Sequence, residues 1–177
     1  MSKPVYTVLS ILTEVYTMKK SDFLMLAELR RNSRQRLTKL SKKTGVPVST
    51  LFQRMKLFNE KIIKGYTILL DEAKLGFSTK AYILLKCKKD NKQAVIERLS
   101  KDWNVNSIYR INNGWDLLVN TVFPSMKELE EFTESLDKEF EIKAKEVHYI
   151  IEELKREAFF TDNGFVDFLS KQEGTID

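Results

Sequence analysis

Apolar side chains recur every three or four positions between residues 18 and 60, which predicts three short helices. The first begins at a cap formed by Ser21 or Asp22 and ends near Asn32. Its buried stripe is predicted to consist of Phe23, Leu26, Ala27 and Arg30. The second helix, residues 36–44, buries Leu37 and Leu40.

Glycine and proline mark the turn between the second and third helices. Gly45 follows the second helix, where a left-handed glycine is the least costly termination. Pro47 suits the start of a helix over residues 48–59, because its missing N–H is not needed there. The predicted core face of this third helix consists of Val48, Leu51, Phe52, Met55 and Phe58.

The opposite face of the third helix is the candidate recognition surface. It holds Ser49, Thr50, Gln53 and Leu57, with Arg54 and Lys56 at its flanks. Small polar and amide side chains between cations suit a helix laid in the major groove, where the centre reads base edges and the flanks meet phosphates. The alternative is an ordinary solvated face, and Leu57 either contacts a thymine methyl group or packs within the protein.

A second pattern starts after Gly65. Residues 66–70 are predicted as a strand that leads out of the helices, and Leu75-Gly76-Phe77 as a turn. The remaining elements are strand 81–88, helix 91–100, strand 105–111, strand 115–122, helix 125–138 and strand 145–151. Asn112-Asn113-Gly114 is a hairpin signal, and Ser125 with Glu128 resembles a capping box. The order βαββαβ is that of a ferredoxin-like sandwich.

These patterns divide the chain into five segments. Residues 18–65 form a helix-turn-helix module, 66–78 a connecting strand and linker, and 79–157 the ferredoxin-like domain. Residues 1–17 are either an added amphipathic helix or absent from a protein that starts at Met18. The tail, 158–177, either docks through its few apolar residues or frays.

Charge is distributed unevenly between the two halves. From Met18 to Tyr66 thirteen Lys and Arg side chains face three acidic ones, whereas residues 67–177 carry sixteen basic and twenty-one acidic side chains. The whole-chain charge of +5 therefore conceals a strongly basic module, which favours a polyanionic partner. The candidate phosphate contacts are Arg34, Arg36, Lys42, Lys43, Arg54, Lys56, Lys61 and Lys64.

Residue usage argues against several chemistries. Cys87 and His148 are the only residues of their kinds, which argues against a disulfide, a thiolate cluster or a catalytic triad and suits a reducing cytoplasm. Both are expected to be ordinary strand residues. We predict no catalytic residue, metal or cofactor, and no membrane partner, since the apolar stretch 5–16 is too short to span a bilayer.

Three stretches together carry a family resemblance. They are NSRQRLTKLSKKTGVPVSTLFQRMK in the helix-turn-helix, IIKGYTILLD followed by Leu75-Gly76, and Gly114-Trp115-Asp116. In this order the chain resembles the Lrp/AsnC (feast/famine) transcription regulators, especially archaeal members, over residues 18–157. The resemblance implies a winged helix-turn-helix joined to a ferredoxin-like, RAM-type domain, hence an α+β fold and no enzyme activity.

The resemblance also implies partners. These are promoter DNA at palindromic sites, a second copy of the chain in a homodimer, tetramers or octamers of such dimers, and an amino acid or other small effector. The effector loop corresponds to Asn113, Gly114, Trp115 and Asp116, although Trp115 is bulkier than the usual residue and Asp116 also suits a hairpin cap.

Two other classes remain as alternatives. Some proteins of this layout resemble sirohaem decarboxylases, for which His148 and Arg110 are the comparable pair here. A ligand-sensing or interaction module without a specific DNA target would bind DNA without sequence preference.

Overall fold

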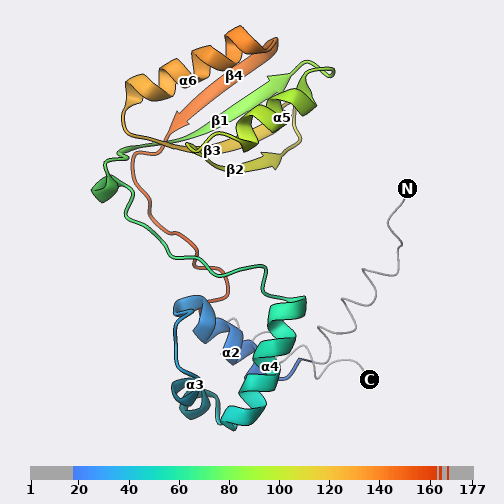
Figure 1. Ribbon diagram of the computed structural model, residues 1–177, viewed down its shortest axis with the longest axis vertical. Coiled ribbons are helices and arrows are strands. Elements are labelled where there is room, and N and C mark those ends of the chain that lie inside the picture. Colours follow the sequence, from blue (N-terminus) through green and yellow to red (C-terminus); the bar gives the residue numbers. More distant parts are fainter. Residues whose placement is uncertain (1–17, 163, 165–166, 168–177) are drawn as a thin grey trace. The chain divides into compact units, whose positions relative to one another are not determined.

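The computed structural model describes residues 18–162, 164 and 167 (Figure 1), so the predictions for residues 1–17 lie outside the described residues. The chain forms two compact units. The helical unit contains residues up to Ile68 together with residues from Lys155 onwards, and the sheet unit runs from Leu69 to Leu154. The chain therefore passes between the units twice.

The helical unit is a helix-turn-helix built from α2 (Lys20–Arg31), α3 (Leu37–Thr44) and α4 (Val48–Lys61). Its core contains Met25, Ala27, Leu40, Leu51 and Phe58, each almost completely buried. Gly45 ends α3 with φ 71°, and its amide donates to the Ser41 carbonyl at 2.9 Å, which confirms the predicted left-handed cap. Pro47 holds the N-cap position of α4.

Helix α2 departs from the prediction at its start and on its buried face. Lys19, not Ser21 or Asp22, is the N-cap residue, and its amide donates to the Asp22 carboxylate at 3.0 Å. Arg30 is exposed, so its predicted place in the core is wrong, whereas Met25 and Leu29 are buried. The helix is buried on most sides, including at Asp22 and Glu28, so a single apolar stripe does not describe it.

Helix α4 is rotated relative to its predicted core face. Leu51 and Phe58 are buried and Met55 is half-buried, but Val48 is 40% and Phe52 60% exposed. At 100° per residue, the buried stripe lies about 40° around the helix from the predicted centre. Val48 and Phe52 belong to the surface because α2 and α3 contact α4 from one side only.

The predicted strand at residues 66–70 is absent. Residues 62–78 contain a turn and the short 3₁₀ helix η1 (Ala73–Leu75), without a strand or hairpin in this described segment. A strand needs a hydrogen-bonded neighbour, and none of the described strands pairs with this segment. Gly76 turns the chain after η1 with φ 91°, in agreement with the predicted turn.

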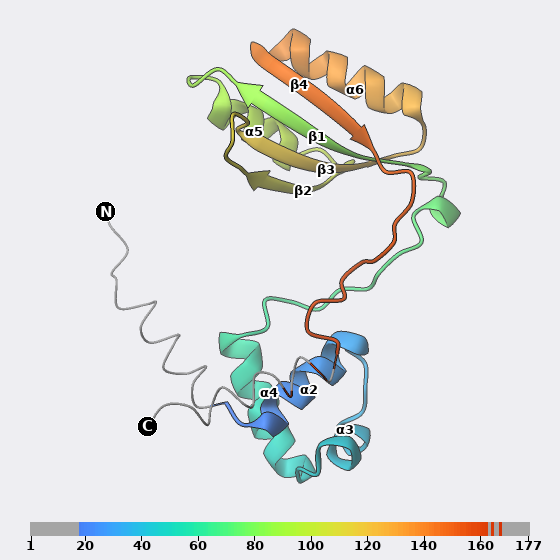
Figure 2. The same cartoon turned by 180° about the vertical axis from the view of Figure 1, so that it is seen from behind.

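The sheet unit is a ferredoxin-like sandwich (Figure 2), as predicted. Its elements are β1 (Thr79–Cys87), α5 (Lys92–Ser100), β2 (Val105–Arg110), β3 (Leu117–Phe123), α6 (Met126–Glu139) and β4 (Ile142–Tyr149). The four strands are antiparallel in the order β2-β3-β1-β4. Ser125 caps α6, because its hydroxyl accepts from the Glu128 amide at 3.3 Å. Strand β4 begins three residues earlier than predicted, because Ile142 pairs with Cys87 across a register shift.

Both helices of the sheet unit pack on the same face of the sheet. Alternate residues of β1 and β3 join one core with Val95 and Leu99 of α5 and with Leu129 and Leu136 of α6. The intervening residues point to the other face, where Leu84 pairs with Leu118 and Tyr82 pairs with Asn120. These side chains are only half-buried, so this open face carries apolar area without a cover from the described part of the sheet unit.

The buried carboxylate of Glu28 generates a prediction about stability. A hydrogen bond from Lys43 is the main cause that lowers its pKa from the usual 4.5. A folded-state pKa below the unfolded one adds stability above the unfolded pKa, and this contribution is lost as the pH falls through the folded pKa. We expect Glu28→Gln to destabilise the helical unit by about 1–3 kcal/mol at neutral pH. The difference in free energy of unfolding between the variant and the wild type should become smaller below pH 4.5.

Amide hydrogen exchange in α2 and α3 measures this effect locally. Glu60→Gln is the matched control, since Glu60 is an exposed residue of α4. If Glu28→Gln lost no more protection than Glu60→Gln, the contacts of Glu28 would not contribute to the stability of the helical unit.

Candidate nucleic-acid interface

The exposed face of α4 carries the side chains predicted to read bases. Ser49, Thr50 and Gln53 are exposed, and Leu57 is 36% exposed. Because the buried stripe runs through Leu51 and Phe58, the direction opposite to the core points between Ser49 and Gln53. Thr50 lies further around the helix, so α4 presents hydroxyl and amide groups on its exposed face, and these are groups that recognise base edges.

Exposed cations lie on α4 and on the neighbouring elements of the helical unit. Arg34 and Arg36 lie in the connection between α2 and α3, and Lys42 lies in the last turn of α3. Lys56 and Lys61 lie on α4, and Lys64 follows it. All six are exposed, so the helix-turn-helix carries positive charge on the connection as well as on α3 and α4.

Two of the cations predicted to contact phosphates, Lys43 and Arg54, pair with buried carboxylates. The Lys43 ammonium of α3 bonds to Glu28 of α2, and the Arg54 guanidinium of α4 lies 3.4 Å from Asp22 of α2. Both carboxylates are buried, at 7% and 4% exposure, and buried charge requires a partner. These pairs therefore tie α2 to both other helices.

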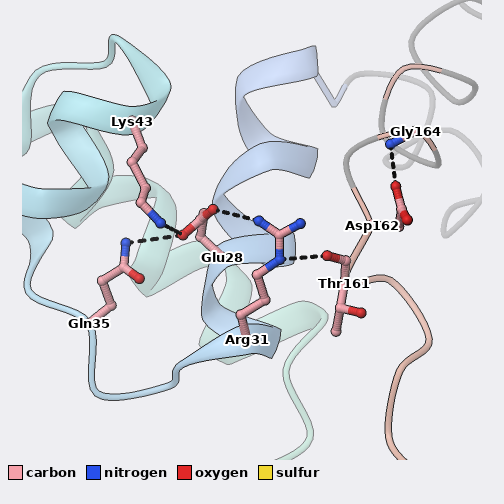
Figure 3. A network of polar contacts seen from close by, with 7 residues as sticks. All are labelled: Glu28, Arg31, Gln35, Lys43, Thr161, Asp162 and Gly164. Carbon is pink, nitrogen blue, oxygen red and sulfur yellow. Dashed lines mark hydrogen bonds and ion pairs between the residues drawn. The ribbon is translucent and has the colours of Figure 1, made fainter. Parts of the chain in front are cut away.

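Glu28 is the centre of a larger network (Figure 3). Its second oxygen accepts from the Arg31 guanidinium at 3.0 Å, and the Gln35 amide donates to the oxygen that Lys43 also contacts. Sequence reasoning missed this network. Its signal was present, because Asp22, Glu28 and Glu60 are the only acidic residues between residues 18 and 66.

The predicted effector loop is a tight turn whose acidic residue already has partners. Asn113 and Gly114 have positive φ, at 58° and 88°. The Asp116 carboxylate accepts from the Lys92 ammonium at 2.6 Å and from the Cys87 amide at 3.0 Å. The Lys92 hydrogen bond is the main cause that lowers the pKa of Asp116. These contacts give Asp116 the role of joining the loop to β1 and α5.

The other single residues have structural surroundings. Cys87 is buried at the end of β1, and burial is the main cause that raises its pKa. His148 is exposed on β4 with its Nε2 atom 3.2 Å from Glu146, as expected of a surface strand residue. Among the described residues, no group of three His, Cys, Asp or Glu side chains is arranged to hold a metal ion, and no helix is long and apolar enough to cross a membrane.

The sheet separates the two residues of the alternative enzyme reading. Arg110 lies on β2 and His148 on β4, which are the opposite edges of the sheet. Three strand spacings of about 4.8 Å already place their backbones roughly 14 Å apart. Arg110 and His148 therefore do not lie on neighbouring strands.

Comparison with known proteins gives consistent matches. Residues 80–158 match the family model described as the Lrp/AsnC ligand binding domain. An uncharacterised HTH-type transcriptional regulator of Pyrococcus furiosus is 33% identical over 104 residues, which cover 56% of this chain and 69% of that protein. The HTH-type transcriptional regulator LrpA of Bacillus subtilis is 31% identical over 119 residues, 66% of this chain and 88% of that protein.

Solved structures show the same fold. A Neisseria meningitidis transcriptional regulator in complex with L-methionine aligns with a TM-score of 0.75 and 21% identity, covering 79% of this chain and 94% of that one. Escherichia coli AsnC aligns with a TM-score of 0.71 and 19% identity, covering 78% and 95%. With a helix-turn-helix in one unit and a ferredoxin-like sheet in the other, the chain belongs to the Lrp/AsnC family of HTH-type transcriptional regulators.

Proposed function

We propose that this regulator binds promoter DNA sequence-specifically as a homodimer, with α4 in the major groove. The observation that carries the proposal is that Ser49, Thr50 and Gln53 are exposed on α4 of a helix-turn-helix that also carries exposed cations. Its polar groups suit base edges, and its cations suit phosphates. Regulation then follows from occupancy of the promoter and needs no catalytic group.

We assign the phosphate contacts to the six exposed cations that surround α4. They are Arg34, Arg36, Lys42, Lys56, Lys61 and Lys64. Lys43 and Arg54 are assigned to the structure of the helical unit, because each one neutralises a buried carboxylate. Pulling either cation toward DNA would leave a buried charge without its partner.

The open face of the sheet supports dimerisation. Tyr82, Leu84 and Leu118 lie there half-buried on neighbouring strands. Contiguous apolar area of this kind is typical of protein interfaces. A second copy of the same face would bury it in a two-fold arrangement, which matches the symmetry of a palindromic DNA site.

A small-molecule effector near Asn113, Gly114, Trp115 and Asp116 stays a prediction. The L-methionine complex of the Neisseria regulator supports an amino acid as its class. Because the Asp116 carboxylate is already hydrogen-bonded, we infer that the backbone of the turn and the side chains of Asn113 and Trp115 would provide the contacts. Assembly beyond the dimer also stays a prediction.

Gln53→Ala tests specific recognition. We expect the variant to lose about 1–3 kcal/mol of binding free energy on the selected site and little on random DNA, because it removes base contacts only. The site is first obtained by selection from random-sequence DNA, and affinities are then measured at fixed salt. Gln93→Ala in α5 is the matched control. Equal losses on both DNAs would contradict base recognition by Gln53.

Two neighbouring lysines of α3 test the assignment of charge. Lys42→Gln should reduce the slope of log K against log salt by about 0.9 for each phosphate contact it removes. Lys43→Gln should leave the slope unchanged and lower the stability of the helical unit, since it unpairs Glu28. Salt titrations and thermal unfolding of both variants measure these effects. A reduced slope in Lys43→Gln together with an unchanged slope in Lys42→Gln would contradict the assignment of Lys42 to a phosphate and of Lys43 to the structure.

Leu84→Asp tests the proposed dimer. A carboxylate in the centre of an apolar interface would be desolvated without a partner, so we expect monomers at concentrations at which the wild type is dimeric. Light scattering after size-exclusion chromatography measures the mass. Leu75→Asp is the control, because Leu75 is 59% exposed on η1, away from the strands. A dimeric Leu84→Asp variant would exclude this face as the interface.

A further inference from the structure

The C-terminal segment of the chain is fastened to α2 through its backbone. Arg30 donates from Nη2 to the Glu157 carbonyl at 3.2 Å and from Nε to the Phe159 carbonyl at 3.3 Å. Arg31 donates from Nε to the Thr161 carbonyl at 2.6 Å (Figure 3). Two adjacent arginines thus hold three carbonyls within five residues, and Arg30 also pairs with the Glu157 carboxylate at 2.9 Å.

An aromatic contact supplements these hydrogen bonds. Phe160 is partly buried against the core of the helical unit, and its ring centroid lies 6.2 Å from that of Phe23 in α2. Glu157 and Phe160 adopt left-handed backbone conformations, with φ of 49° and 63°. Residues with a Cβ rarely adopt these conformations unless surrounding contacts enforce them. Residues 157–161 are therefore held in a defined conformation, and we call them the strap.

The strap is the continuation of the sheet unit. Beyond β4, the Ile150 amide donates to the Lys80 carbonyl at 2.9 Å, and Glu153 pairs with the Lys80 ammonium at 3.2 Å. Residues 154–156 connect Glu153, which pairs with Lys80 of the sheet unit, to Glu157, the first residue of the strap. A segment this short has little conformational freedom.

Lys80 also holds the other connection between the units. Its ammonium lies 2.9 Å from Glu72, in the segment that leads from α4 to β1, and this hydrogen bond is the main cause that raises the pKa of Lys80. Upstream, the Tyr66 hydroxyl donates to Asn59 of α4 at 2.6 Å. One lysine of the sheet unit therefore fastens both segments by which the chain reaches the helical unit.

We propose that the strap, together with the linker, restricts the orientation of the DNA-binding helices and thereby sets the half-site spacing that the dimer selects. The inference rests on the proposed function, since spacing has meaning only for a dimer on paired half-sites. A module on one flexible linker tolerates many spacings, whereas one held at two points tolerates few. The strap contacts Arg30 and Arg31, which are not among the proposed DNA contacts, so it does not compete with DNA.

The test lengthens the segment that connects the sheet unit to the strap and leaves the contacts between the strap and α2 in place. Six Gly and Ser residues are inserted between Leu154 and Lys155 of the full chain, and the control carries the same insertion after Gly174, beyond the anchors described here. Affinities are measured for paired half-sites at the selected spacing and at a spacing five base pairs longer, which turns one half-site to the other side of the duplex. We expect the wild type and control to prefer the first by about tenfold or more, and the slackened variant by less than about threefold.

A pair of phenylalanine variants tests the docking itself. Phe160→Ala removes the partly buried ring that packs on the helical core, and it should relax the spacing preference as the insertion does. Phe159→Ala removes a ring that is 74% exposed and whose centroid lies 6.0 Å from that of Phe160, and it leaves the carbonyl that Arg30 binds, so it should relax the spacing preference less than Phe160→Ala does. Hydrogen exchange of α2 identifies undocking, which should occur in Phe160→Ala but not in the insertion variant.

The outcomes separate the strap from the proposed function. An unchanged spacing preference in the insertion variant, or the absence of a preference in the wild type, would contradict the proposed role of the strap in setting half-site spacing. If the wild type selects no DNA sequence, the proposed function fails. Whether the strap restricts the orientation of the DNA-binding helices is then tested by the distance distribution between spin labels on α3 and α6 in a Cys87→Ser background. A broader distribution after insertion supports the strap, and an equal width overturns it.

Discussion

Two buried carboxylates organise the basic helix-turn-helix. Asp22 and Glu28 lie on α2 at 4% and 7% exposure, and each pairs with a cation from another helix, Arg54 of α4 and Lys43 of α3. Isolated carboxylates would not tolerate this burial, because desolvation costs several kcal/mol per ion. The helical unit is rich in lysine and arginine, so it has cations available to pair with both carboxylates. Lysine and arginine thus supply both the exposed positive charge of the unit and the ion pairs inside it.

This arrangement explains how a small helical unit can hold α4 in a fixed position. Its apolar core is small, and Leu40, Leu51 and Phe58 are the largest contributions from α3 and α4. The ion pairs add fixed points between α2 and its neighbours at either end. Arg31 extends the network to the Thr161 carbonyl, so the docked C-terminal segment belongs to the same set of contacts.

The sheet unit applies the opposite strategy. Its core is continuous and apolar between one face of the sheet and two helices, and the charged groups lie at its margins. Asp116 with Lys92, and Lys80 with Glu72 and Glu153, fasten loops to the sheet. Half-buried apolar side chains lie next to one another on the open face of the sheet, which is where we place the second copy of the chain.

The sequence alone determined the fold class, the helix-turn-helix and the order of strands and helices within the sheet unit. These features depend on local signals such as the periodicity of apolar residues, Gly45 as a cap, and Ser125 before α6. Tertiary structure decided the rest. The core face of α4 was set by its contacts with α2 and α3, which left Phe52 exposed. Lys43 and Arg54 were assigned to buried carboxylates, and Arg30 to the C-terminal segment, through contacts between residues distant in sequence. Periodicity cannot supply such information, because it records which residues are apolar and not which partner each charged residue meets.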